Sequence, residues 1–260
     1  MSTLYVAWQQ PESKEWIPVA RLDYVNGRYR FSYTRGIHRA RDFQTFSRMN
    51  EIDAIYESET LFPLFSNRLI SKSRPEFNNY VRWLGLDNSP EDTMAMLALT
   101  GGIRGTDSLE LFQLPSRTTD GCYVDFFARS LSFLPKSSVD QITNLKQSSQ
   151  LFLMRDFQNS FDSFALALRS EDPTFLVGYC PKYYAKEVNL LIDQNFEVTV
   201  TVKNVNVDAP MNMRLLCSLK AKHPADAYPF GSSIDFQIVG NTVPSVWEHI
   251  DLSVQQSQVP

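Results

Sequence analysis

The chain has 260 residues, of which 43% are hydrophobic and 21% are charged, and its net charge at pH 7 is -4. This length fits one large domain or two of ordinary size, and we favour two. No apolar run approaches the roughly 20 residues that a membrane-spanning helix needs, so the sequence does not indicate a membrane-inserted protein. The first residues, MSTLYVAWQQPES, do not have the pattern of a secretory signal, so the cytoplasm is the expected location.

The three cysteines, Cys122, Cys180 and Cys217, are far apart and odd in number. They form no C-x-x-C pair and have no histidine at ligand spacing, which fits a reducing compartment and speaks against structural zinc. We therefore expect small buried thiols, no bound metal and no cofactor.

The segment from residue 21 to residue 48 is locally basic. Its arginines are Arg21, Arg28, Arg30, Arg35, Arg39, Arg41 and Arg48, against Asp23 and Asp42. Acidic residues follow at Glu51, Asp53, Glu57 and Glu59. Two interpretations stay open: a solvated face balanced by neighbouring acids, or a patch that binds anions.

Strands and then helices are expected in the first half. Apolar residues alternate on both sides of Asn26-Gly27, which predicts a β-hairpin with a type I′ turn and strands near 16–25 and 28–34. Pro75 and an apolar stripe at helical spacing predict a helix that ends at Gly85. A second helix is expected from an N-cap at Ser89, with Pro90 as its first residue, to Gly101-Gly102. The apolar cluster over 61–69 predicts a core-facing helix, with a partner-binding surface as the alternative.

From about Gly121 the pattern changes to short strands at roughly ten-residue spacing, with one helix from Lys182 to Asp193. Such strands predict a small barrel or sandwich. A shift of the apolar phase predicts a bulge near Lys203-Asn204. The fold class is therefore α+β, a small N-terminal sheet with packed helices followed by a small β-barrel with one helix. We divide the chain into 1–117, 118–240 and a C-terminal tail, 241–260.

Residues that would indicate an enzyme are scarce. The chain has no Walker loop, no H-E-x-x-H and no G-x-S-x-G, and its three histidines are scattered singly, so we expect no catalytic residues. A nuclease or hydrolase that uses Asp156, Asp162 and Glu171 around a metal ion is a minor alternative.

The stretch RDFQNSFDSFALALR, residues 155 to 169, contains more than a turn requires. Arg155-Asp156, Asn159, Phe161-Asp162, Ala165-Leu166, Val177-Gly178-Tyr179 and the helix from Lys182 follow one another in an order that resembles the HIRAN family. The resemblance covers roughly residues 122 to 240. It implies a small β-barrel related to OB folds that holds the 3′-OH end of single-stranded DNA.

The resemblance also implies roles for particular residues. Phe161 would stack on the terminal base, Asp162 would accept a hydrogen bond from the 3′-hydroxyl, and Tyr179 and Lys182 would face base and phosphate. The set of DNA-binding residues implied in this way is Phe161, Asp162, Tyr179, Lys182, Asn159, Arg155 and Phe133. The family's Arg-aromatic pair on the first strand aligns with Ser132-Phe133, so one cation is lost. Two structural alternatives stay open, that Asp162 caps the turn and that Phe161 belongs to the core.

The first half resembles, more loosely, the N-terminal subdomain of HipA-type toxin kinases. The similar segments are VARLDY with YRFSYT, LFPLFSNRLISKSRPEFNNYVRWLGL, and DTMAMLALTGGIRGTDSLEL, within residues 5 to 115. The kinase core does not follow. The resemblance implies a protein-binding module in which Asn67, Arg68 and Arg74 have structural roles.

Two functional hypotheses result. The first is a bacterial, cytoplasmic, non-enzymatic adaptor that binds single-stranded DNA or DNA ends, within a stress, toxin-antitoxin or phage-defence system. The second is an antitoxin-like inhibitor of a HipA-family Ser/Thr kinase that does not bind DNA. The charge of residues 122–240, with 11 basic and 12 acidic residues, favours the second, because it gives little electrostatic attraction for phosphate.

Overall fold

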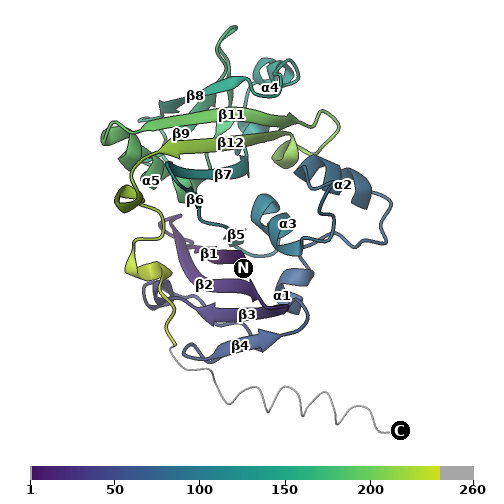
Figure 1. Cartoon of the computed structure of the whole chain (residues 1–260), viewed down its shortest axis with the longest axis vertical. Helices are drawn as coiled ribbons and strands as arrows, with labels where there is room; N and C mark the ends of the chain where they lie inside the picture. Colours follow the sequence, from purple (N-terminus) through teal and green to yellow (C-terminus); the bar gives the residue numbers. More distant parts are fainter. Residues whose placement is uncertain (1, 241–260) are drawn as a thin grey trace. The chain divides into compact units, whose positions relative to one another are not determined.

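The computed structural model of the chain describes residues 2–240 (Figure 1). The predicted tail, 241–260, lies outside the described residues. The fold is α+β, with two antiparallel sheets of five and seven strands and five helices in the described part. None of these helices is both long and apolar enough to cross a membrane.

The chain forms two compact units, and neither is continuous in sequence. Unit 1 comprises, as far as it is described, residues 2–69, Gly101–Gln113 and 231–240. Unit 2 comprises Ile70–Thr100 and Leu114–Phe230. The sequence instead predicts a single boundary after residue 117. The division into a HipA-like module and a HIRAN-like module at that boundary stays a prediction.

The sheet of unit 1 has the strand order β4-β3-β2-β1-β5. Its strands are β1 (Ser2–Gln9), β2 (Trp16–Val25), β3 (Arg28–Tyr33), β4 (Ile55–Ser58) and β5 (Leu109–Phe112). The predicted hairpin is confirmed, because Val25 pairs with Arg28 and both turn residues have positive φ, 52° at Asn26 and 82° at Gly27. Positive φ at both positions is what a type I′ turn requires, and glycine adopts it without steric cost.

The core of unit 1 explains the apolar segment 61–69. Its helix α1 (Pro63–Ser66) is only four residues long, and Phe65 is fully buried with its ring centroid 6.1 Å from that of Phe31. Arg68 has a side chain that is 1% exposed and donates to both carboxylate oxygens of Asp107, at 2.6 and 3.2 Å, and to the Gly102 carbonyl at 2.8 Å. The core-facing interpretation is therefore confirmed at Phe65, whereas the helix is shorter than the predicted segment and Leu61, Phe62, Leu64 and Leu69 are only partly buried.

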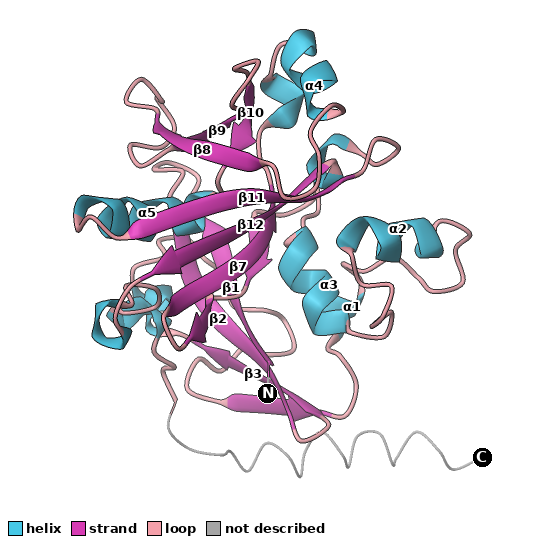
Figure 2. Ribbon diagram, turned by 45° about the horizontal axis from the view of Figure 1, so that its top comes forward, coloured by secondary structure: helices cyan, strands magenta, loops and turns pink. Residues whose placement is uncertain are grey.

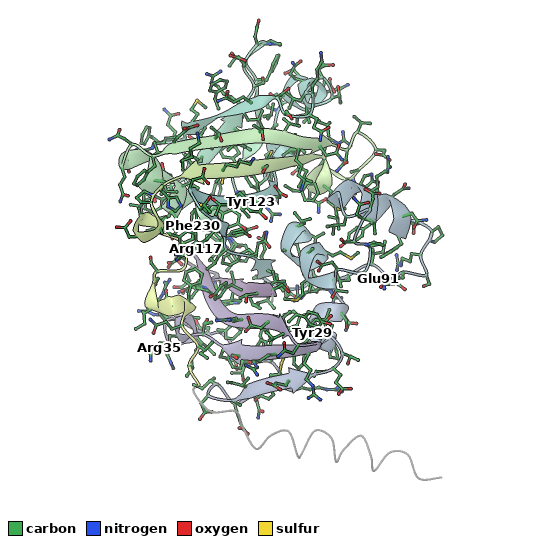
Figure 3. All side chains as sticks on the ribbon, viewed as in Figure 1. Tyr29, Arg35, Glu91, Arg117, Tyr123 and Phe230 are labelled. Atoms are coloured by element: carbon green, nitrogen blue, oxygen red, sulfur yellow. The ribbon has the colours of Figure 1, made fainter. Side chains whose placement is uncertain are left out.

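Four of the seven arginines in the basic segment form ion pairs. These pairs are Arg21 with Asp23, Arg28 with Glu59, Arg30 with Glu57, and Arg39 with Glu15 and Asp235. Arg35, Arg41 and Arg48 are exposed and make no ion pair among the described residues; Arg35 is labelled in Figure 3. Balance by neighbouring acids thus accounts for most, but not all, of this segment.

A strap formed by residues 231–240 completes unit 1. The backbone N–H of Val239 donates to the carbonyl of Tyr33 at 2.9 Å, and the N–H of Arg35 donates to the carbonyl of Gln237 at 2.7 Å. Arg39 also donates to Asp235 at 2.7 Å. The strap therefore adds backbone pairing and one ion pair at the end of β3.

The sheet of unit 2 has the order β10-β9-β8-β11-β12-β7-β6, with antiparallel neighbours throughout. Its strands are β6 (Ser116–Thr118), β7 (Gly121–Phe127), β8 (Gln150–Arg155), β9 (Leu166–Arg169), β10 (Leu176–Tyr179), β11 (Glu197–Val205) and β12 (Leu215–Lys222). The predicted bulge is confirmed, since the register of β11 on β12 shifts between Val202 and Asn204.

The predicted barrel is wrong, because no sheet of the described residues closes. The chain after β7 pairs with β10 at one bridge among the described residues, in which Arg129 and Tyr179 exchange backbone hydrogen bonds of 2.9 and 3.0 Å. Ser130 then has φ of 65°, which turns the chain into the short 3₁₀ helix η2 (Leu131–Phe133). A longer ladder with β10 cannot form once the chain has left the extended conformation.

Four helices belong to unit 2, namely α2 (Phe77–Leu84), α3 (Thr93–Thr100), α4 (Lys136–Ile142) and α5 (Lys182–Asp193). Helix α2 ends at Gly85, with φ of 68°, as predicted. The predicted start of the next helix is wrong: α3 begins at Thr93, because the carboxylate of Asp92 accepts from the N–H of Ala95 at 2.8 Å and takes the capping role assigned to Ser89. Helix α5 has the predicted bounds and packs on β11 (Figure 2).

Candidate nucleic-acid interface

The loop between β8 and β9, residues 156–165, is here called the site loop. Its conformation is set by three side chains that accept hydrogen bonds from nearby backbone N–H groups. Asp156 accepts from Gln158 at 3.3 Å, Asn159 from Phe161 and Asp162 at 3.0 Å each, and Asp162 from Phe164 at 3.0 Å. Asn and Asp favour such turns because their short side chains reach the backbone two or three residues on.

Three further side chains hold the site loop against β10 and α5. The hydroxyl of Tyr179 donates to Asp156 at 3.0 Å, and the ammonium of Lys182 donates to the carbonyl of Phe161 at 2.8 Å. Asn189, in the middle of α5, donates to the carbonyl of Phe164 at 2.9 Å. Burial, and then the hydrogen bond to the Asp156 carboxylate, raise the pKa of Tyr179. The structure therefore brings Tyr179 and Lys182 to the site loop as supports.

The aromatic side chains of the site loop lie in solvent. Phe157 is 85% exposed, Phe161 is 77% exposed and Phe164 is 44% exposed. The alternative that Phe161 belongs to the core is therefore wrong. The alternative that Asp162 caps the turn is confirmed for one oxygen, Oδ1, whereas Oδ2 accepts no hydrogen bond from the described residues. The loop backbone is thus hydrogen-bonded to the loop's own side chains, and the loop presents large apolar rings outward.

Phe133 is the last residue of η2 and is 88% exposed. It makes no ring contact with the loop in the described part of the chain. This chain has Ser132 where the family has an arginine, but another arginine, Arg129, lies three residues earlier. The backbone of Arg129 pairs with Tyr179, and its guanidinium donates to the hydroxyl of Tyr183 at 3.1 Å. Arg129 was not singled out from the sequence, although this residue directly follows the strand-forming segment YVDFFA.

Arg155 lies toward the other end of α5. It donates to Asp193 at 2.5 Å and to the carbonyl of Asn189 at 3.3 Å. It lines a hollow of about 190 Å³, here called the α5 hollow. The lining residues are Arg155, Asp156, Phe157, Ser163, Phe164, Ala165, Lys186, Asn189, Leu190 and Asp193. Phe157, Phe164 and Lys186 were not predicted as site residues.

The metal-dependent alternative finds no support in the geometry. Asp156 uses both of its oxygens and Asp162 uses Oδ1 as hydrogen-bond acceptors within the protein, and Glu171 lies beyond β9. Within residues 2–240 no three His, Cys, Asp or Glu side chains are placed to hold a metal ion together.

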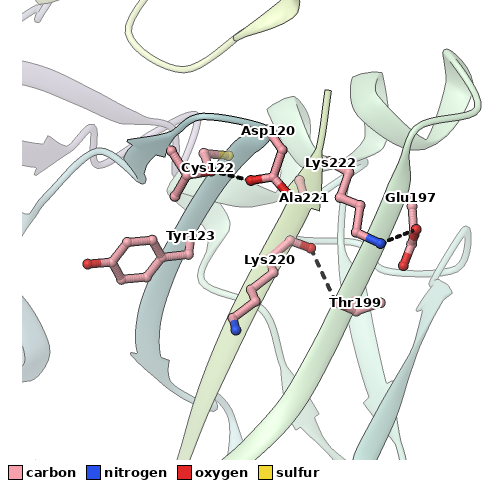
Figure 4. Close-up of a pocket in the computed structure, with 9 residues that line it drawn as sticks. Asp120, Cys122, Tyr123, Glu197, Thr199, Lys220, Ala221 and Lys222 are labelled. Atoms are coloured by element: carbon pink, nitrogen blue, oxygen red, sulfur yellow. Dashed lines mark hydrogen bonds and ion pairs between the residues drawn. The ribbon is translucent and has the colours of Figure 1, made fainter. Parts of the chain in front are cut away.

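A second and larger cavity, of about 550 Å³, lies on the face of β7, β12 and β11 (Figure 4). Tyr123 on β7 lies opposite Lys220 on β12, and Lys222 pairs with Glu197 at 2.9 Å. Cys122 contacts His223, with Sγ and Nε2 3.4 Å apart. Burial raises the pKa of this thiol to about 11, so it stays protonated and is poorly suited to act as a nucleophile.

Comparison with known proteins identifies part of the chain. The HIRAN domain family matches residues 122–222. Among solved structures, the HIRAN domain of human HLTF is 12% identical, with 41% of this chain and 79% of that chain covered and a TM-score of 0.32. A protein from Lactobacillus plantarum is 17% identical, with 39% and 92% covered and a TM-score of 0.31. No curated protein matches. The family match alone places a HIRAN domain at residues 122–222, and the resemblance of the first half to HipA kinases stays a prediction.

Proposed function

We propose that the HIRAN domain binds the 3′ end of single-stranded DNA at the site loop. The observation that carries this proposal is the exposed ring of Phe161 on a loop whose backbone is hydrogen-bonded by Asn159 and Asp162, with one oxygen of Asp162 left over after capping. Stacking of a base on an aromatic ring stabilises binding by about 1–3 kcal/mol and does not depend on sequence. A platform that is ordered before binding loses little conformational entropy when the base arrives.

Each residue then has a defined role. Phe161 stacks on the terminal base, and Oδ2 of Asp162 accepts from the 3′-hydroxyl. A carboxylate accepts from a hydroxyl but repels a phosphate, so it distinguishes a strand end from an interior linkage. Asn159 and Tyr179 hold the loop in place, and the charges of Lys182 and Arg129 attract the backbone of the terminal nucleotide.

For the whole chain we propose a non-enzymatic adaptor in the bacterial cytoplasm, acting in a stress, toxin-antitoxin or phage-defence system. The first half would supply the protein-binding module, as its resemblance to the HipA subdomain implies. A second candidate is an inhibitor of a HipA-family kinase that does not bind DNA. It is favoured by the fact that Lys182 and Arg155, two cations assigned to DNA, donate to protein acceptors.

Fluorescence anisotropy of two oligonucleotides tests the DNA proposal. Both carry a 5′ label and the same sequence, and they end in a 3′-hydroxyl or a 3′-phosphate. We expect tighter binding of the hydroxyl end. Phe161→Ala should weaken it by about 5- to 150-fold, the equivalent of one stacking interaction. Asp162→Asn keeps the capping oxygen and removes the negative charge, so it should narrow the difference between the two ends.

The matched control is Tyr123→Ala, which removes an exposed aromatic ring from β7, away from the site loop. It should bind both oligonucleotides as the unaltered chain does. Equal and very weak binding of both ends by the unaltered chain, or unchanged binding by Phe161→Ala, would reject the DNA proposal. Inhibition of a purified HipA-family kinase by the chain would then support the second candidate.

A further inference from the structure

We propose that the α5 hollow takes the second base of the same strand, so that the bound DNA runs from Phe161 along α5 toward Leu190. The inference rests on the proposed function and adds a second base subsite to it.

The walls of the α5 hollow are apolar and partly uncovered. Phe157 and Phe164 contribute rings from the site loop, and Leu190 contributes an exposed side chain from α5. Exposed apolar residues are ordinary when single, but three around one hollow indicate a surface that a ligand covers. The flat faces of aromatic rings favour a flat ligand such as a nucleobase.

Among the charged side chains that line the hollow, Lys186 is the one positioned to contact a phosphate. Asp193 is neutralised by Arg155, and Asp156 accepts from Tyr179 and Asn159. Lys186 makes no ion pair among the described residues, and its ammonium lies 5.9 Å from the centroid of the Phe164 ring. A cation beside an aromatic face matches a nucleotide, whose base stacks while its phosphate meets the charge.

The direction of the strand follows from the helix. Lys182 and Lys186 are four residues apart on α5 and so lie on one face, about one turn or 5–6 Å apart. Lys182 contacts the backbone of Phe161, and Lys186 lies over Phe164. The two lysines therefore mark two successive positions, the first at the proposed end site and the second at the hollow.

A peptide fits the hollow less well than a base. An extended peptide binds largely through backbone hydrogen bonds. At Phe164 both backbone groups are already used, because the N–H donates to Asp162 and the carbonyl accepts from Asn189. The hollow thus offers rings and charge rather than a free strand edge.

A double-mutant cycle between a base and Phe157 tests the inference. The probe is a 5′-labelled, 3′-OH oligonucleotide, either complete or with an abasic site at the second nucleotide from the 3′ end. In the unaltered chain the abasic site should weaken binding by about 5-fold or more, because about 5-fold is the lower limit of the effect of one stacked base. In Phe157→Ala the abasic site should cost little, because its stacking partner is already absent.

Two controls complete the design. An abasic site at the fifth nucleotide should have the same effect on the unaltered chain and on Phe157→Ala. In Lys186→Gln the dependence of log Kd on log salt should fall by about 0.7, the value for one phosphate contact on a single strand.

An equal cost of the second-position abasic site in the unaltered chain and in Phe157→Ala would overturn the inference, as would an unchanged salt dependence in Lys186→Gln. If Phe161→Ala and the 3′-phosphate still weaken binding in that case, the end site stands and only the second subsite is refuted. Loss of all preference for the 3′-hydroxyl end would refute both.

Discussion

Replacement of Asn159 with alanine tests whether the site loop is fixed before it meets a ligand. The change removes the oxygen that accepts from the N–H groups of Phe161 and Asp162, at 3.0 Å each. It also removes a weaker contact, the 3.3 Å hydrogen bond from Asn159 to Asp156. The backbone N–H groups of Phe161 and Asp162 then lose their acceptor and must donate to water instead.

The magnitude follows from these contacts. A hydrogen bond contributes about 0.5–1.5 kcal/mol net, so the two bonds at 3.0 Å together stabilise the closed loop by about 2 kcal/mol. Their loss should raise the population of the open loop by about 30-fold. The effect is local, because the strands on either side of the loop keep their own hydrogen bonds.

Amide hydrogen exchange measures this population residue by residue. In Asn159→Ala the amides of Phe161 and Asp162 should exchange about 30-fold faster than in the unaltered chain, while those of β8 and β9 keep their rates. Gln158→Ala is the matched control on the same loop, since the exposed side chain of Gln158 forms no hydrogen bond in the described structure. The variant should also bind 3′-OH oligonucleotides more weakly, although Asn159 is assigned no contact with the base.

Unchanged exchange at Phe161 and Asp162 in Asn159→Ala would show that the Asn159 oxygen does not hold the loop. Faster exchange throughout β8 and β9 would show that the loop and the sheet open together, and the argument for a locally fixed platform would fail.

Two further predictions concern unit 1. Arg68→Ala should lower the free energy of unfolding by about 3 kcal/mol, because it leaves Asp107 and the Gly102 carbonyl without their buried partner; urea denaturation that shows no shift of the midpoint would contradict this. Burial raises the pKa of Tyr33 to about 12, so the folded state keeps a proton that the unfolded chain loses near pH 10. The contribution of Tyr33 to the free energy of unfolding should therefore be fully present below pH 10. Between about pH 10 and 12 the free energy of unfolding should fall by up to about 1.4 kcal/mol per pH unit. Urea midpoints at pH 8 and pH 11 should show a smaller fall in Tyr33→Phe, and an equal fall would refute the assignment.

Local signals in the sequence predicted local structure well. Asn26-Gly27 determines its own turn through positive φ, and the apolar stripe of α5 needs only helical spacing to be recognised. The start of α3 was missed because Ser89 and Asp92 are both good caps, and the choice between them depends on the turn that precedes the helix. The open sheet depends on the conformation of Ser130, a residue type with no strong preference for positive φ.

At the candidate site, too, the sequence predicted local features but not contacts between distant segments. The sequence identified the site loop because its Asn and Asp residues act on their own backbone within three positions. It did not identify Arg129 or Lys186, because their positions depend on where β7 and α5 lie relative to the loop. It also could not show that Lys182 would donate to the Phe161 carbonyl, which is a contact across 21 residues.

The strap has a consequence for how the protein is made. Every strand of the first sheet has been synthesised by Phe112, but the partners of Tyr33 and Arg35 are Val239 and Gln237. At about 5–20 residues per second, the ribosome needs on the order of 10 s more to supply them. The larger segment of unit 2, Leu114–Phe230, is synthesised during that interval. The half of the protein that begins first is therefore the half that is completed last, and a chain cut short after Phe230 would contain all of unit 2 but only an unfinished unit 1.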